Sequence, residues 1–181
     1  MGYRPICDMW IMARPKVKYY GAYPNGFLGR ARALLGVSID DSVLHVCSGM
    51  VKDYPCQGFG PNDKTLDLDG NLKPDFNQDC MESLPDMCGQ GWPAILADPP
   101  YTFEDGEHYK PGGICVPKPT ALLRHCLGAV RTGGRVGMLH YEFPRPPKWA
   151  KLVACVGVLM GYCNRVRLYS VFERVTGTIL G

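Results

Sequence analysis

The chain has 181 residues, of which 46% are hydrophobic and 20% are charged, as is typical of a folded globular protein. At this length we expect residues 1–181 to form a single domain with a sizeable core. No apolar stretch is long enough to span a bilayer, and the first residues lack the apolar run of a signal peptide. These features argue against an integral membrane protein and favour a cytoplasmic one.

Nine cysteines are present, but no two of them have the Cys-x-x-Cys spacing of zinc and redox motifs. An odd number of cysteines cannot form a complete disulfide framework. Several lie in or beside apolar runs, as reduced and buried cysteines do. The sequence therefore predicts reduced thiols and no bound metal.

Charge is unevenly distributed along the chain, although the net charge is only +3. Residues 1–39 carry +5, residues 40–100 carry −8, and residues 101–181 carry +6. Basic flanks around an acidic centre suit a protein whose ends contact phosphates while its centre holds a cationic ligand. An ordinary mixed surface can have the same totals, so this pattern does not decide between the two.

The first part of the chain predicts one helix and one strand. Residues 1–15 are expected to be irregular, and residues 16–26 to form an aromatic-rich loop. The apolar spacing indicates a short helix over 27–35 that ends at Gly36. An apolar run at 43–47 predicts the first strand of the sheet.

Short strands follow in the acidic centre of the chain. Residues 50–64 hold two prolines and two glycines, so we expect no full helix there. Strands are predicted over 65–69 and 75–79, and a buried strand over 92–97. A long loop is expected at 102–117.

The last part predicts a helix over 118–130, in which apolar residues share one face, and a strand over 135–141. Residues 152–160 and 165–174 are interpreted as a pair of strands, with a helix over 148–160 as the alternative. Short strands separated by crossover connections indicate an α/β fold with a mostly parallel sheet.

One four-residue motif, Asp98-Pro99-Pro100-Tyr101, directly follows the predicted strand at 92–97. Prolines cannot donate to a sheet ladder, so the strand ends there. A carboxylate, a proline carbonyl and an aromatic ring are thereby fixed at the edge where open α/β sheets bind ligands. The two oxygens can accept both hydrogens of an amino group, and a tyrosine ring can stack on a planar base.

The motif resembles the DPPY motif of S-adenosylmethionine-dependent amino-methyltransferases, which methylate exocyclic amines of nucleic-acid bases. The resemblance covers roughly residues 16–142. It implies a Rossmann-like methyltransferase fold with a C-terminal antiparallel hairpin, S-adenosylmethionine as cofactor, and no metal. It assigns catalysis to Asp98, Pro99, Pro100 and Tyr101: the carboxylate and the Pro99 carbonyl would orient the amine, and Tyr101 would stack on the base.

The same resemblance implies cofactor contacts in the family's order along the chain. The segment at 20–26 would pack on the methionine part, and the turn at 47–49 would bring the backbone close to the cofactor, with one glycine where the family usually has two. Asp67, with Asp69 as the alternative, would bind the ribose, and Asp79 the adenine amine. The implied cofactor-binding residues are Tyr20, Tyr23, Asn25, Gly26, Cys47, Ser48, Gly49, Asp67, Asp79 and Asp98.

Other polar residues near the motif are candidates for the substrate. The substrate-binding residues we expect are Tyr101, His140, Tyr141, Arg145 and Lys148. Trp149, Arg165 and Arg167 can also contact phosphates and bases, or can be surface residues. The loop after the motif holds Glu104, Asp105, Glu107 and His108, whose spacing matches no metal-ligand pattern. It is interpreted as a solvated loop, with a lid over the substrate as the alternative.

The resemblance therefore implies a methyltransferase that acts on an exocyclic amine, with adenine N6 in DNA or RNA as the favoured target. A base in a duplex would have to flip out to reach the site. The alternatives are another planar amine or amide in a protein or small molecule, and a non-catalytic protein that binds nucleotide or nucleic acid. Because the chain has no room for a separate recognition domain, we expect loose specificity, a homodimer or a specificity partner.

Overall fold

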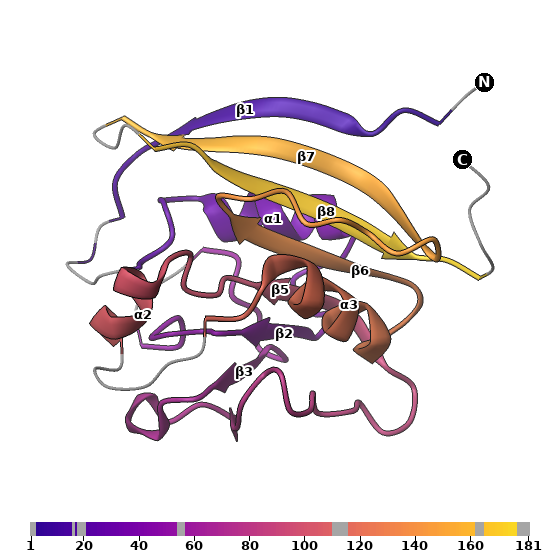
Figure 1. Cartoon of the computed structure of the whole chain (residues 1–181), viewed down its shortest axis with the longest axis horizontal. Coiled ribbons are helices and arrows are strands. Elements are labelled where there is room, and N and C mark those ends of the chain that lie inside the picture. Colours follow the sequence, from indigo (N-terminus) through magenta and orange to yellow (C-terminus); the bar gives the residue numbers. More distant parts are fainter. Residues whose placement is uncertain are drawn as a thin grey trace.

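The computed structural model describes residues 3–15, 17, 21–53, 57–109, 116–161 and 165–176. Its centre is an eight-stranded sheet (Figure 1). The strands are β1 (Ile6–Met12), β2 (Val43–Val46), β3 (Lys64–Asp67), β4 (Phe76–Asn77), β5 (Trp92–Ala97), β6 (Val130–His140), β7 (Ala150–Met160) and β8 (Arg167–Arg174). The helices are α1 (Phe27–Leu35), η1 (Gly70–Leu72), α2 (Phe103–Tyr109) and α3 (Pro119–Ala129). Among the described residues, no helix is long and apolar enough to cross a membrane.

The strand order is β1-β7-β8-β6-β5-β2-β3-β4. Strands β4, β3, β2, β5 and β6 are mutually parallel, and β8 runs antiparallel to both β6 and β7. The predicted mostly parallel sheet with a C-terminal antiparallel hairpin is therefore confirmed. In such a sheet, the carboxyl ends of β2, β3, β5 and β6 meet at one edge.

Helices α1 and α3 cover opposite faces of the sheet (Figure 1). Along β2, Val43 packs in the cluster with α1, and Leu44 packs in the cluster with α3. This alternation follows from the two-residue period of a strand. Buried on both faces, the central strands have the continuous apolar sequences that parallel sheets require.

The prediction for residues 1–15 is wrong, because residues 6–12 form β1. This strand pairs in parallel with β7, with Ile6 opposite Ala154. The two strands are more than 140 residues apart in the sequence. Only Trp10 and Met12 of β1 are buried, so the segment lacks the alternation that marks a strand. On the exposed part, the amide of Met9 donates to the carboxylate of Asp8 over 2.7 Å.

Two further predictions need correction. Part of the expected loop at 102–117 is helix α2, which begins where the hydroxyl of Thr102 accepts a hydrogen bond from the amide of Asp105. This is half of a capping box, and the spacing Thr-x-x-Asp is visible in the sequence. Strand β6 begins at Val130, before the expected start at residue 135, because the pairing with β5 shifts and absorbs the glycines near its start.

Other elements agree with prediction. Helix α1 spans Phe27–Leu35, and Gly36 ends it with φ of 70°, the left-handed conformation that glycine adopts without a steric penalty. Residues 150–160 form a strand, so the alternative helix over 148–160 is excluded. Residues 50–53 and 57–63 hold neither helix nor strand.

A buried ion pair joins α1 to β2 and β3. The Nη1 atom of Arg32 lies 2.9 and 2.8 Å from the two carboxylate oxygens of Asp63, and both residues are only 6% exposed. Asp63 also accepts hydrogen bonds from the amides of Val43 and Gly60 and from Nε2 of His45. Burial alone would raise the pKa of Asp63, but the hydrogen bonds from His45, Gly60 and Arg32 hold the pKa below its usual value.

We predict that Asp63→Asn destabilises the fold by about 3–5 kcal/mol, since it leaves a buried guanidinium without its counter-ion. Urea unfolding at pH 7 measures this difference. Because the pKa of Asp63 is lowered in the folded state, its contribution is complete at neutral pH and is lost as the pH falls below about 4. The difference between the wild type and the variant should shrink over the same range.

Asp40→Asn is the matched control, because Asp40 is exposed and has the same chemistry. It should change the free energy of unfolding by less than about 0.5 kcal/mol. Equal effects of the two substitutions would show that the buried pair does not stabilise the fold.

Candidate active site

Asp98 lies at the carboxyl end of β5, beside the end of β2. Its amide donates to the carbonyl of Val46 over 3.2 Å. Its Oδ1 atom accepts a hydrogen bond from the hydroxyl of Tyr101 at 2.5 Å. Burial raises the pKa of Asp98 to about 6, although the charge of Arg167 and the Tyr101 hydrogen bond act to lower it. At neutral pH Asp98 is therefore an ionised carboxylate of unusually high basicity.

Tyr101 belongs to an aromatic group at the ends of β5 and β6. Its ring centroid lies 5.3 Å from that of His140 and 4.7 Å from that of Tyr141, both at steep angles. The ring also packs against the core cluster on the α1 side of the sheet. Its hydroxyl thus points at Asp98, while the ring is wedged between neighbours.

His140, at the end of β6, is 2% exposed. Its Nδ1 atom accepts a hydrogen bond from the amide of Glu142 over 2.9 Å. Burial lowers the pKa of His140, so the ring is neutral at pH 7 and must carry its proton on Nε2. Within the described residues, this Nε2 has no hydrogen-bond partner. The site therefore holds a buried donor that is not used.

Arg167 opens β8 and is 7% exposed, so it is not the surface charge that the sequence allowed. Its neighbour Leu168 pairs with His140 of β6, which puts Arg167 at the same edge of the sheet. The charge of Arg167 acts on both Asp98 and Tyr101. Alternation along β8 puts Arg167 on the same face as Tyr169 and Val171, which are buried in the core.

The expected cofactor residues of β2 and β3 come together. The Oδ2 atom of Asp67 accepts a hydrogen bond from the amide of Gly49 at 2.9 Å, and its Oδ1 accepts one from the amide of Asp69 at 3.0 Å. The amide of Ser48 donates to the carbonyl of Leu66. Asp67, and not Asp69, therefore faces the turn after β2.

The turn after β2 has left-handed backbone at two of its residues. Gly49 has φ of 53°, and Cys47 has φ of 56°. Only a few per cent of non-glycine residues adopt such a conformation. Cys47 thus supplies the backbone geometry of a glycine where the sequence has one glycine fewer than the resemblance implies.

Asp79 approaches this turn through its neighbour. The sulfurs of Cys47 and Cys80 lie 3.8 Å apart, which brings the segment after β4 next to the turn. Asp79 itself accepts a hydrogen bond from the amide of Met81 at 2.8 Å. Its Oδ1 thus stabilises the local turn.

The segment before α1 is only partly described, and Tyr20 lies outside the described residues. Tyr23 is buried and stacks on Phe27, with ring centroids 5.1 Å apart. Asn25 is exposed, and its amide donates to the carbonyl of Ala13. Gly26 has φ of 79° at the start of α1. Tyr23 is therefore a core residue in this structure.

Helix α2 lies over the same segment. A Cβ atom built on Gly21 would fall 2.0 Å from the hydroxyl of Tyr109, so the backbone there passes directly beside α2. Among the described residues, no group of three His, Cys, Asp or Glu side chains could hold a metal. The side chain of His108 lies outside the described residues. The close approach of Gly21 to Tyr109 keeps α2 next to the site.

The structure does not bring Arg145 and Lys148 into contact with Asp98. Both side chains are exposed on the segment between β6 and β7. The amide of Arg145 donates to the hydroxyl of Thr120 over 3.0 Å, which fixes this segment beside the start of α3. Arg145 and Lys148 therefore lie at the surface that flanks the site.

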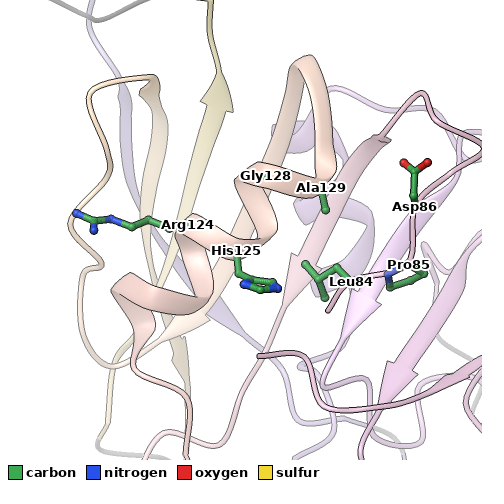
Figure 2. Close-up of a pocket in the computed structure, with 7 residues that line it drawn as sticks. All are labelled: Leu84, Pro85, Asp86, Arg124, His125, Gly128 and Ala129. Carbon is green, nitrogen blue, oxygen red and sulfur yellow. The ribbon is translucent and has the colours of Figure 1, made fainter. Parts of the chain in front are cut away.

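A separate pocket of about 450 Å³ lies between the loop at 84–86 and the second half of α3. Figure 2 shows His125 and Leu84 pointing toward one another, while Arg124 points away. This part of α3 leads into the amino end of β6, so the pocket is at the opposite edge of the sheet from Asp98. None of the predicted site residues lines it.

No family model matches the chain, and no curated protein matches it. Solved structures do match. TrmN from Thermus thermophilus has 18% identity and a TM-score of 0.58, over 86% of this chain and 50% of TrmN. The 23S rRNA methyltransferase ErmE has 12% identity and a TM-score of 0.52, over 88% of this chain and 71% of ErmE.

SMU.1697c from Streptococcus mutans, solved in complex with SAH, has 9% identity and a TM-score of 0.51, over 85% of this chain and 100% of its own. The protein thus has the Rossmann-like methyltransferase fold. It spans half the length of TrmN.

We predict that Tyr101→Phe raises the pKa of Asp98 above its value of about 6, because the hydroxyl that stabilises the carboxylate is lost. Titration of the Asp98 carboxyl carbon by NMR measures the pKa directly. Tyr141→Phe is the control, since Tyr141 packs on the Tyr101 ring and, among the described residues, Asp98 accepts a hydrogen bond from the hydroxyl of Tyr101 and not from that of Tyr141. An unchanged pKa in Tyr101→Phe would contradict the hydrogen bond.

Proposed function

We propose that the protein is an S-adenosylmethionine-dependent methyltransferase that acts on an exocyclic amino group of a nucleic-acid base, with adenine N6 as the favoured acceptor. The observation that supports this proposal most directly concerns Asp98. It is a partly buried carboxylate at the carboxyl edge of a methyltransferase fold, and its pKa is raised to about 6. Strongly perturbed groups in such positions are typical of active sites. The methyltransferase ErmE, which has this fold, is named for its 23S rRNA substrate.

The residues on the β2 and β3 side fit the proposed cofactor. Gly49 and Cys47 have the left-handed backbone of a tight turn, and Asp67 presents a carboxylate beside it. A carboxylate oxygen that already accepts one amide hydrogen bond can accept another, so Asp67 can still bind ribose hydroxyls. When bound, S-adenosylmethionine supplies an electrophilic methyl group. Cys47, Ser48, Gly49, Asp67 and Asp79 are the residues proposed to hold it.

Asp98 and the carbonyl of Pro99 are proposed to orient the acceptor. An exocyclic amine is a poor nucleophile because its lone pair is delocalised into the ring. Two acceptors that bind both N–H groups favour a tetrahedral nitrogen with a localised lone pair. As positive charge develops on nitrogen, the Asp98 carboxylate stabilises it. With a pKa near 6, Asp98 is also basic enough to take up the proton that the product amine releases.

We predict that Asp98→Asn abolishes methyl transfer and retains cofactor affinity, because its role is toward the acceptor. Calorimetry with S-adenosylhomocysteine measures the affinity, and transfer of a labelled methyl group to RNA and DNA measures turnover. Wild-type turnover should rise with pH and level off above about 6, since the carboxylate is the active form. Near-normal turnover in the variant, or no cofactor binding by the folded wild type, would contradict the proposed function.

The same variant carries its own folding control. The raised pKa of Asp98 means that ionisation costs stability in the folded state above about pH 6. Asp98→Asn removes that cost, so at pH 8 it should be more stable than the wild type by about 1–2 kcal/mol. A lost activity then cannot be ascribed to unfolding.

We also predict that polynucleotide binding depends steeply on salt and uses the basic flank after β6. Replacing Arg145 and Lys148 by alanine should lower the slope of log K against log salt by about 1.4–1.8, since two phosphate contacts are lost. Titration of labelled RNA and DNA at several salt concentrations measures the slope.

The control replaces Lys52 and Lys73, which lie in the acidic centre of the chain, and should leave the slope unchanged. Salt-independent binding, or no binding to either polymer, would favour a protein or small-molecule acceptor instead.

A further inference from the structure

Arg167 is buried at the acceptor side of the site. It opens β8, and its neighbour Leu168 pairs with His140 on one side and with Gly157 of β7 on the other. Arg167 is 7% exposed, although most arginines in proteins are at the surface. Nothing in the hairpin requires a charge here, because Tyr169 and Val171 on the same face are packed in the core.

One donor of this guanidinium is left over. The Nη2 atom of Arg167 is buried and, within the described part of the chain, has no hydrogen-bond partner. Leaving a buried donor unsatisfied costs about 1–3 kcal/mol, and more for a charged group. Such a group in a folded protein calls for an explanation, and a bound ligand that supplies the missing acceptor is one.

The strand order shows on which side of Asp98 this arginine lies. Asp98, which directly follows β5, lies between β2, β3 and β4 on one side and β6 and β8 on the other. The residues proposed for the cofactor follow β2, β3 and β4, whereas Arg167 opens β8 on the opposite side. Arg167 therefore lies on the side of Asp98 away from the residues proposed for the cofactor, which is the side left for the acceptor substrate.

The charge of the site favours a neutral partner. The guanidinium of Arg167 lies close enough to the Asp98 carboxylate to act on its ionisation, so a counter-ion is already present. A second anion, such as a phosphate, is not needed for charge balance. A neutral acceptor atom completes the hydrogen bonding of Nη2 without adding charge to a partly buried site.

We propose that Arg167 determines substrate specificity by donating a hydrogen bond from Nη2 to an unprotonated ring nitrogen beside the reactive amine. This inference rests on the proposed function and narrows its substrate class. In adenine, the ring nitrogens N1 and N7 flank the amine, and in cytosine N3 does so. Together with the two acceptors at Asp98 and Pro99, this donor makes a pattern that an aliphatic amine cannot match.

Analogues that lack one ring nitrogen test the inference on the wild-type protein. Calorimetry in the presence of S-adenosylhomocysteine compares adenosine with 1-deazaadenosine and 7-deazaadenosine, and cytidine with 3-deazacytidine. At least one carbon-for-nitrogen replacement should weaken binding by about tenfold or more, the effect expected for a hydrogen bond to a charged group. Equal binding of every analogue and its parent, or no binding of any nucleoside, would overturn the inference.

Variants show whether Arg167 causes the weaker binding of the deaza analogues. Arg167→Met should bind parent and analogue equally, whereas Arg131→Met, at an exposed arginine near the opposite end of β6, should keep the wild-type difference. If Arg167→Met does not fold, the wild-type analogue series still decides the result. Methyl transfer without any dependence on the ring nitrogen overturns only this inference. A ring-nitrogen dependence in binding without methyl transfer overturns only the proposed function.

Discussion

The buried ion pair of Arg32 and Asp63 is the constraint on which the rest of the fold depends. Arg32 comes from α1, and Asp63 directly precedes β3 and binds the first amide of β2. Desolvating both charges is expensive, and their mutual attraction offsets it together with further hydrogen bonds, among them those from His45, Gly60 and Val43 to Asp63 and from Arg32 to the carbonyls of Ser38 and Asp41. The pair thus fixes α1 and the loop that follows it relative to the strands next to the turn at 47–49.

With that frame fixed, the carboxyl edge of the sheet can hold residues that a stability-driven fold would avoid. Asp98 is ionised at a position where burial favours its protonated form. Cys47 has left-handed backbone, and His140 and Arg167 each keep a buried donor without a partner in the described residues. These unfavourable features lie at the ends of β2, β5, β6 and β8, as expected where stability is given up for binding.

Elements with a complete local signal could be predicted from the sequence. Helix α1 has periodic apolar residues and a glycine stop, and β5 is an apolar run that two prolines end. Strand β1 could not be predicted, because its pairing with β7 is a contact between the two ends of the chain. Helix α2 had a signal in the Thr102 cap, but its short length and internal glycine obscured the signal.

In the site, too, local sequence signals predict some residues, whereas others depend on contacts between distant parts of the chain. The resemblance predicted Asp98, Tyr101 and the turn at 47–49 as site residues, because their neighbours in sequence define the motif. Burial of Arg167 depends on which face of β8 meets the core, and the left-handed φ of Cys47 belongs to a turn that packs beside Cys80. Both are properties of the assembled sheet. Alternation along β8 would have indicated only that Arg167 shares a face with Tyr169 and Val171.

Strand β1 also determines how the sheet ends. It is an edge strand with exposed Ile6, Met9 and Ile11, the kind of surface on which another chain can add a strand. The amide of Met9 already donates to the Asp8 carboxylate, so it is not available to pair with another strand. A single acidic side chain therefore interrupts the row of backbone donors and places a negative charge at the rim. At this edge, the Asp8 carboxylate therefore opposes the addition of another strand.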